Sequence, residues 1–284
     1  MANYCVFYNS KSNSGHGEEL ARKLSDLLKD DTLTFQDMVG SDLKQMFASV
    51  PADTKCLICG GDGTLNYIVN HVDENDLPNE VWYFPAGTGN DFTNDIGGGD
   101  KPQEIRRYLV NLPTVTIKGK TYKFINGVGY GIDGYCCEEG DRQRAKSDKP
   151  VNYTSIAILG LLFHFKPANA VITVDGKKEI YKKVWLAPMM NGRYYGGGMM
   201  PTPDQDRLNP GHQLSLLVWY GSGKIPTLAA FPGIFKGEHV KKTKMCKVLT
   251  GHDITVEFDA PIAAQVDGDT ILAVTKCEAH AYRG

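Results

Sequence analysis

The chain has 284 residues, of which 42% are hydrophobic and 23% are charged, and its net charge at pH 7 is −2. This balance is that of an ordinary globular protein of one or two domains, and it excludes the strongly basic field of nucleic-acid-binding proteins. The longest apolar run, 156–163, is far shorter than the roughly 20 residues that span a bilayer, and no leader-like segment opens the sequence. A cytoplasmic protein without a membrane-spanning helix and without a nucleic-acid partner is therefore expected.

The seven cysteines do not indicate a disulfide-bonded secreted protein, because they are odd in number and irregularly spaced. Cys56 and Cys59 form a C-x-x-C pair within an apolar run. Residues three positions apart on a strand point to opposite faces. The pair is therefore expected to fill the core and not to share a zinc ion.

The first part of the chain alternates between strand-like and helix-like segments. Strands are predicted at 3–8, 32–35, 56–59 and 81–84, and helices at 18–28, 42–49 with Ser41 as the cap, 65–71 and 101–109. This alternation is typical of a mostly parallel sheet that helices cover on both faces. Three polar, glycine-bearing loops follow strands, at 9–17, 60–64 and 87–91. Because ligands bind at the carboxyl ends of strands in such sheets, these loops predict a phosphate-binding site.

The loop Gly60-Gly-Asp-Gly-Thr64 carries the most specific signal. Its glycines leave backbone N–H groups accessible, and such a loop before a helix N-terminus binds anions. Asp62 is unusual there, because a carboxylate repels a phosphate unless a cation lies between them or the carboxylate handles a proton. The loop therefore predicts a nucleotide phosphate with Mg²⁺, or acid–base chemistry. The alternative is a glycine turn with an Asp cap.

After about residue 113 the pattern changes to short strands separated by turns. Strands are predicted at 115–117, 122–126, 171–174, 183–187, 214–219, 247–249 and 254–258, with one helix from about 153 to 165. This spacing is typical of an antiparallel sandwich or barrel. The helix is apolar almost all round, which is typical of a core helix; the wall of a lipid slot is the alternative. Domains are expected at 1–120 and 121–269, with the last segment, 270–284, packing back on the first domain or pairing with the second.

Five motifs occur in order along the chain, at 60–66 (GGDGTLN), 85–91 (PAGTGND), 126–133 (NGVGYGID), 191–198 (NGRYYGGG) and 265–268 (QVDG). Together they resemble the diacylglycerol kinase catalytic domain family, which includes soluble bacterial lipid kinases and is related to sphingosine kinases. The resemblance covers nearly all of the chain. It implies a three-layer α/β nucleotide-binding domain of the kind shared with NAD kinases, a C-terminal antiparallel β-sandwich, and a site in the cleft between them.

The same resemblance implies transfer of the γ-phosphoryl group of ATP, with Mg²⁺, to the hydroxyl of a lipid such as diacylglycerol at the membrane surface. Asp267 matches the base that takes the acceptor proton, and Asp62, Asp91 and Asp133 match acids of a water-and-metal network around the phosphates. Asp62 is the acid expected to act on the metal, through the Mg-nucleotide. The residues expected to bind the nucleotide are Asn9, Gly60, Gly61, Asp62, Gly63, Thr64, Asn66 and Thr88.

Simpler interpretations of two of these acids remain open. The run Val266-Asp-Gly-Asp269 is also a good hairpin turn, and Asp91 alone is typical of a helix cap.

Three positions depart from the family pattern. Ser10 stands where a proline usually follows the first Asn, and Asp269 stands where a glutamate commonly follows the Asp-Gly pair. Pro210 stands where bacterial members carry an aspartate that binds a structural Mg²⁺. Because proline offers only its carbonyl, this metal site is not predicted; Asp204, Asp206 and Asn209 are the alternative ligands.

Two other functions remain as alternatives. An NAD kinase-like enzyme would share the GGDGT loop, although the motif at 85–91 and the late Asp267-Gly pair favour a lipid kinase. A lipid- or nucleotide-binding regulatory protein that has lost turnover is the other, and the three departures keep it open. The sequence leaves the acceptor lipid, the choice of ATP or GTP, and a homodimer undecided.

Overall fold

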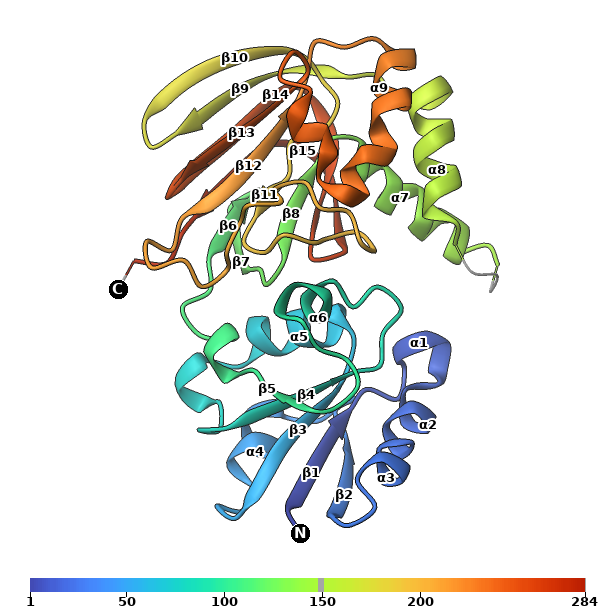
Figure 1. Cartoon of the computed structure of the whole chain (residues 1–284), viewed down its shortest axis with the longest axis vertical. Helices are drawn as coiled ribbons and strands as arrows, with labels where there is room; N and C mark the ends of the chain where they lie inside the picture. Colours follow the sequence, from blue (N-terminus) through green and yellow to red (C-terminus); the bar gives the residue numbers. More distant parts are fainter. Residues whose placement is uncertain (148–150, 284) are drawn as a thin grey trace. The chain divides into compact units, whose positions relative to one another are not determined.

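The computed structural model describes residues 1–147 and 151–283, and the chain forms two compact units, Met1–Leu112 and Pro113–Gly284. Each unit has its own sheet and its own hydrophobic core (Figure 1).

The first unit is built on a five-stranded sheet in the order β2-β1-β3-β4-β5. Its strands are β1 (Asn3–Tyr8), β2 (Thr32–Asp37), β3 (Thr54–Gly60), β4 (Val81–Pro85) and β5 (Gln103–Glu104). The first four run parallel, and the short β5 pairs with β4 in the antiparallel direction. The apolar runs of β1 and β3 are buried on both faces, as in the centre of a parallel sheet. The predicted α/β architecture is confirmed.

Helices cover both faces of this sheet. They are α1 (Ser12–Gly15), α2 (Gly17–Arg22), α3 (Leu24–Leu27), α4 (Leu43–Ala48), α5 (Asp62–His71) and α6 (Asp91–Ile96), with the 3-10 helices η1 (Glu74–Asp76) and η2 (Arg106–Tyr108). Val6 of β1 packs with Ala21 and Leu24 on one face. The next residue, Phe7, points to the other face and meets Phe47 of α4 with 5.3 Å between ring centroids. The alternation along β1 thus holds a helix layer on each side.

The predicted helix at 101–109 is wrong. This stretch forms β5 and η2, because tertiary bonds override helical propensity there. The guanidinium of Arg106 donates to the carbonyl of Pro78 at 2.9 Å, and its backbone N–H donates to the Glu104 carboxylate at 2.7 Å.

Smaller details of this unit also differ from the predictions. The helix expected at 18–28 is divided into α2 and α3 at Lys23. Helix α4 is capped by Asp42, whose carboxylate accepts the N–H of Gln45 at 3.2 Å, and not by Ser41. Helix α6 was not predicted.

The second unit is an antiparallel β-sandwich, as predicted. Its strands are β6 (Thr114–Ile117), β7 (Lys120–Lys123), β8 (Gly127–Tyr130), β9 (Ala168–Val174), β10 (Lys177–Val184), β11 (Met189–Met190), β12 (Leu214–Trp219), β13 (Cys246–Gly251), β14 (Asp253–Val266) and β15 (Asp269–His280). The long β14 pairs with β9 in its first half and with β8 in its second half. Its register with β15 shifts between Glu257 and Ile262, where the strand passes from one part of the sandwich to the other.

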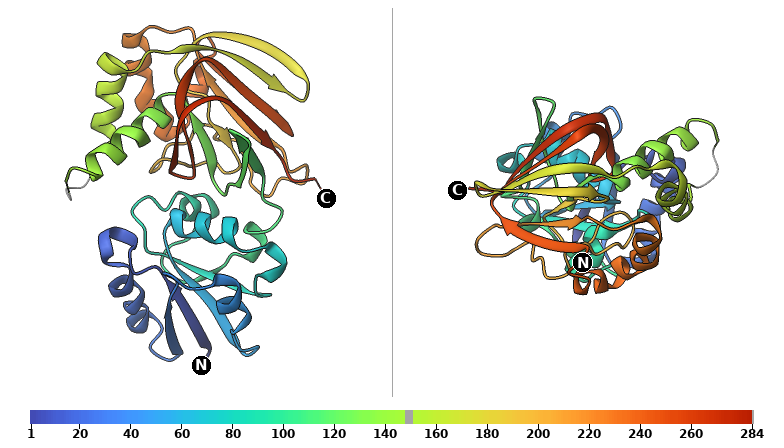
Figure 2. Two further views of the ribbon diagram at one scale, coloured as in Figure 1. Left: turned by 180° about the vertical axis from the view of Figure 1, so that it is seen from behind. Right: turned by 90° about the horizontal axis from the view of Figure 1, so that it is seen from above.

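The prediction of a single helix in this unit is wrong. The helices are α7 (Ile132–Arg144), α8 (Tyr153–Leu159), the π-helix η3 (Gly160–His164), α9 (Lys224–Ala230), η4 (Phe231–Lys236) and η5 (Glu238–Lys241). Helices α7, α8 and α9 gather on one side of the sandwich (Figure 2). They share a second core with Trp185 and Trp219. Within the described ranges, no helix is long and apolar enough to cross a membrane.

The compact units meet in sequence at 112/113, a few residues before the expected boundary near 120. The reason is that β6 pairs with β15 in the second sheet. The segment 270–284 contains most of β15, which pairs with β14 and β6. Residues 270–280 are therefore part of the second sheet.

Candidate active site

The expected nucleotide loops follow the carboxyl ends of neighbouring parallel strands. Tyr8 of β1 pairs in register with Cys59 of β3, and Gly60 pairs with Pro85 of β4. The residues that follow these strands, beginning with Asn9, therefore lie at one edge of the first sheet. The thiol of Cys59 is buried at this edge, and burial raises its pKa to about 12, so it remains a neutral core group.

The two glycine loops pack directly on each other. A Cβ on Gly61 would lie 3.0 Å from the Cα of Gly87, and a Cβ on Gly87 would lie 2.6 Å from the Cα of Gly61. No other residue type fits this backbone contact without displacement. The N–H of Ala86 also donates to the carbonyl of Gly60 at 2.8 Å. The motifs at 60–66 and 85–91 therefore form one structural element of the first unit.

Asp62 provides a further link between the loops. Its carboxylate accepts the N–H groups of Asp91 at 3.0 Å and Phe92 at 2.8 Å, the first two residues of α6. The free N–H groups of a helix N-terminus and the helix dipole both stabilise a carboxylate placed there. The Asp62 side chain thus caps a helix, but the helix belongs to the second motif. Its action through Mg²⁺ stays a prediction.

The other residues of these loops that were expected to bind the nucleotide differ in exposure. Gly63 and Thr88 are exposed, and a Cβ on Gly63 would stand in open space. Thr64 and Asn66 are buried. A Cβ on Gly60 would lie 2.5 Å from the Thr64 hydroxyl, so Thr64 supports the loop from behind.

Asn9 forms a local turn at the end of β1. Its side-chain oxygen accepts the N–H of Lys11 at 2.9 Å, and its carbonyl accepts the N–H of Ser12 at 3.0 Å. Ser10 donates its own N–H to the Asp37 carboxylate at 3.1 Å. A proline has no N–H to make this bond. In this chain the hydrogen bond to Asp37, at the end of β2, therefore holds the loop after β1. A proline at position 10 would instead restrict this loop through its fixed φ angle.

In the second unit, Asp267 is the centre of a polar cluster. It occupies the β14–β15 hairpin turn with a φ of 46°, and Gly268 follows with a φ of 100°. One carboxylate oxygen accepts the N–H of Ile125 at 2.6 Å, and the other accepts those of Asn126 at 2.9 Å and Gly127 at 3.0 Å. Three donors orient the carboxylate and stabilise its negative charge. Asp267 is thus a hairpin residue and also holds a distant segment in place.

The motif at 191–198 joins the same cluster. The N–H of Asn191 donates to the carbonyl of Asn126 at 2.9 Å, and its side chain donates to that of Ile125, also at 2.9 Å. The guanidinium of Arg207 bonds the Ile125 carbonyl at 3.3 Å and the Asn126 side chain at 3.1 Å. Sequence reasoning missed Ile125, Asn191 and Arg207. Only Asn191 had a signal, since it lies within a motif.

Asp133 lies in the first turn of α7 and is buried. Its carboxylate and the amide of Gln265 both lie over Gly129, where a Cβ would meet them at 1.7 and 2.5 Å. Burial raises the pKa of Asp133 to about 6, against the opposing effects of the Gly134 N–H and the side chains of Tyr195 and Gln265. Gln265 also accepts the N–H of Gly268 at 2.6 Å, so its side chain lies near Asp133 and is bonded to the Asp267 turn. Asp62 and Asp91 thus lie in the first unit, and Asp133 and Asp267 lie in the second.

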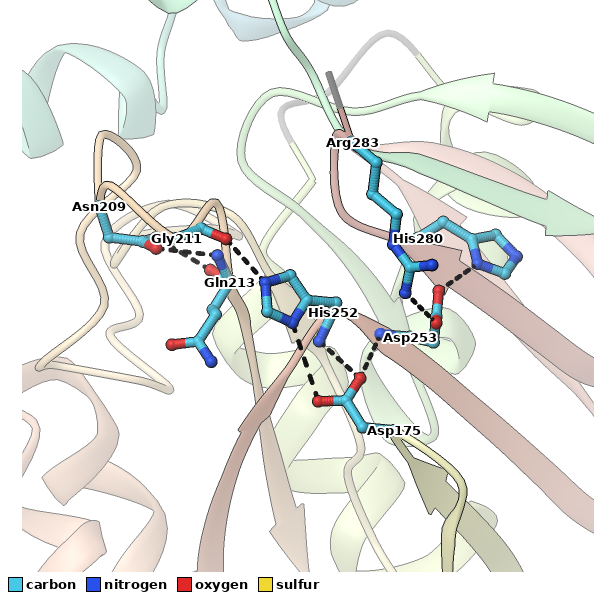
Figure 3. A network of polar contacts seen from close by, with 8 residues as sticks. All are labelled: Asp175, Asn209, Gly211, Gln213, His252, Asp253, His280 and Arg283. Carbon is cyan, nitrogen blue, oxygen red and sulfur yellow. Dashed lines mark hydrogen bonds and ion pairs between the residues drawn. The ribbon is translucent and has the colours of Figure 1, made fainter.

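The loop at 202–213 is the stretch for which the family resemblance raised the question of a structural metal. Asn209 donates to the carbonyls of Asp206 and Gln213 at 2.7 and 3.0 Å and accepts the N–H of Gln213 at 2.8 Å. The His252 imidazole bonds the Gly211 carbonyl at 2.8 Å (Figure 3). Among the described residues, no group of three or more His, Cys, Asp or Glu side chains could hold a metal ion. Hydrogen bonds within the chain close this loop.

Comparison with protein families assigns both units. Residues 3–119 match the model of the diacylglycerol kinase catalytic domain, and residues 126–278 match that of the YegS C-terminal NAD kinase beta sandwich-like domain. The second match alone covers more than half of the chain.

Individual proteins give the same result. A diacylglycerol kinase from Mycobacterium tuberculosis is 29% identical over 273 residues, which is 90% of this chain and 85% of that protein. Mouse diacylglycerol kinase eta is 31% identical over 122 residues, 40% of this chain and 10% of that protein. The crystal structure of a diacylglycerol kinase from Bacillus anthracis has the same fold, with a TM-score of 0.60 and 17% identity over 99% of this chain and 94% of that one.

Proposed function

The chain belongs to the diacylglycerol kinase family of lipid kinases, and we propose that it transfers the γ-phosphoryl group of ATP to the hydroxyl of a lipid such as diacylglycerol. The nucleotide is assigned to the first unit and the acceptor hydroxyl to the second. The protein takes this lipid from a membrane surface that it visits from the cytoplasm.

The glycine loops support the nucleotide assignment. Gly63 is exposed, and the space around its Cα is open. It follows Asp62 at the start of α5, and the backbone N–H groups at a helix N-terminus are suited to bind an anion. The phosphates bind along the loop from Gly60 to Thr64, with Thr88 of the second loop beside them. A Mg²⁺ ion bound with the nucleotide would neutralise part of the phosphate charge at this loop. Asp62, whose carboxylate is fixed at the N-terminus of α6, is the acid assigned to that ion.

Asp267 supports the acceptor assignment. In the proposed step the lipid hydroxyl oxygen bonds to the γ-phosphorus, the bond from phosphorus to the bridging oxygen breaks, and ADP leaves. The hydroxyl proton passes to the Asp267 carboxylate. Phosphoryl transfer depends mainly on positioning and charge neutralisation, so a weak base that is rigidly oriented suits the reaction.

The observation that carries the proposal is the convergence on Asp267. Segments around 125–127, 191–192 and 265–268 carry three of the five motifs, and in the second unit they meet through hydrogen bonds to and around this carboxylate. A hairpin turn needs no such assembly for its own stability.

The testing experiment measures phosphate transfer from labelled ATP with Mg²⁺ to a panel of lipid alcohols in mixed micelles and, separately, to NAD. We expect one lipid to be labelled, and Asp62→Ala to lose the label while thermal unfolding shows that it still folds. Labelling of NAD and of no lipid would establish the NAD kinase-like alternative. Nucleotide binding without transfer to any acceptor would indicate a regulatory protein and refute the proposal.

A further inference from the structure

The outer side of the rod formed by α8 and η3 is apolar. Its inner side packs into the second unit through Ile156 and Leu161. On the outer side, Ile158, Leu159 and Phe163 are exposed, and Phe163 is 68% exposed. A helix with one apolar face on a core ordinarily turns a polar face to water. Packing within the unit therefore leaves this second apolar face unexplained.

The start of α9 extends the same surface. Both views show α9 beside the α8–η3 rod, and the ammonium of Lys224 donates to the Leu162 carbonyl of η3 at 2.7 Å. The next residue, Ile225, is 77% exposed. We call Ile158, Leu159, Phe163 and Ile225 the outer apolar surface. Single exposed apolar side chains are ordinary, but a group on two packed helices is typical of a binding surface.

The charges that accompany this surface are basic. The stretches 151–174 and 207–237, which contain both helices, have no Asp or Glu, although the chain has 33 such residues. Their exposed lysines are Lys166, Lys224 and Lys236. Acidic side chains of the adjacent α7 are in ion pairs with Arg142 and Arg144. Apolar side chains beside lysines, without acids, complement an anionic and partly apolar partner.

We infer that the outer apolar surface docks this protein on an anionic membrane. Phe163 and Ile225 enter the headgroup region, while Lys166 and Lys224 remain at the level of the lipid phosphates. The Lys224 ammonium has three N–H donors and donates one to Leu162, so it can also donate to a lipid phosphate. The choice of membrane as the partner rests on the proposed function, because a lipid kinase takes its substrate from a bilayer.

The test is sedimentation with vesicles of phosphatidylcholine alone and of phosphatidylcholine with phosphatidylglycerol. The variants are Phe163→Asp with Ile225→Asp, and the matched control is Ile180→Asp. Ile180 is 71% exposed on β10, so it has the same residue type and nearly the same exposure as Ile225 but lies outside the surface. Circular dichroism and light scattering are recorded for each variant.

We expect the wild type to bind the anionic vesicles and the double variant to bind them at least about tenfold more weakly, with the control unchanged. Equal binding by the double variant and the wild type would overturn the inference. Failure of the wild type to bind either kind of vesicle would also overturn it. A dimeric wild type that the double variant renders monomeric would identify the surface as a contact between two copies and would also overturn it.

Activity separates this inference from the proposed function. The double variant should lose phosphorylation of diacylglycerol in vesicles but keep that of a short-chain diacylglycerol dissolved in water. If no lipid is ever phosphorylated, the proposed function fails, while vesicle binding still decides the role of the surface. If soluble diacylglycerol is phosphorylated and the double variant binds vesicles normally, only the docking inference fails.

Discussion

Replacing Asp267 with asparagine should separate its chemical role from its structural role. The amide keeps one oxygen, which can still accept the N–H groups of Asn126 and Gly127. Its NH₂ group then faces the N–H of Ile125, and the charge is gone. Losing one charge-assisted bond and weakening two others should cost about 2–4 kcal/mol of stability. Loss of a general base should also lower kcat by about 100- to 10,000-fold.

The chain contains a matched control for this substitution. Asp175 occupies the β9–β10 turn with a φ of 47°, followed by Gly176 with a φ of 81°. One of its carboxylate oxygens accepts the N–H groups of His252 and Asp253, both at 2.9 Å (Figure 3). Asp175→Asn keeps an oxygen for both donors and should cost about 1–2 kcal/mol, with kcat within about twofold of the wild type.

The assay is steady-state transfer with the lipid acceptor found in the first experiment, with urea unfolding of the same preparations. We expect Asp267→Asn to lose turnover while its KM for ATP stays near that of the wild type. A kcat within about threefold of the wild type would refute the base assignment, since removal of a base costs far more. Loss of turnover in Asp175→Asn to the same extent would show that folding and not proton transfer explains the effect.

Three further outcomes are expected. Gly63→Ala places a methyl group in open space at the start of α5, so thermal unfolding should be unchanged or raised while the KM for ATP rises; an unchanged KM would contradict phosphate binding at this position. Burial raises the pKa of Asp133 from 3.8 to about 6, so the folded state binds this proton more tightly than the unfolded chain, and stability falls by about 3 kcal/mol as the pH rises from about 4 to about 6. Urea titrations should therefore show Asp133→Asn gaining stability over the wild type at pH 7.5 and not at pH 4, and parallel pH profiles would contradict this. Chelation by EDTA should leave the unfolding temperature within about 1 °C, because Asn209 closes the loop at 202–213 without metal; a fall that Mg²⁺ restores would contradict it.

The sequence predicted the elements whose signals are local. The strands β1, β3 and β12 were found because their apolar runs are continuous and bounded by turn residues. Helix α7 was missed because it begins within a glycine-rich motif and its later turns are charged on several sides. The prediction of a helix at 101–109 was wrong because the conformation there depends on a hydrogen bond from Arg106 to the carbonyl of Pro78.

The candidate site was predictable to the same degree. Conspicuous side chains such as Asp62 and Asp267 could be named from the motifs that contain them. Their partners could not, because Phe92, Ile125 and Gly127 contribute only backbone N–H groups, which every residue except proline possesses. The contact between Gly61 and Gly87 was equally hidden, since nothing in either loop specifies its neighbour.

The bonds around Asp267 also constrain the order in which the second unit acquires its native state. They join residues that are 140 to 142 positions apart in the chain. Closing so long a loop costs conformational entropy and is slow. This cost is incurred before the contacts that the closed loop permits can stabilise the chain. Before the β14–β15 hairpin packs against the segment that precedes β8, the chain can form the hairpin turn. The Asp267 carboxylate in that turn then still lacks the three N–H groups that orient it. Recovery of catalytic activity during refolding should thus not precede the closure of this long loop, and a chain in which it is still open should be inactive.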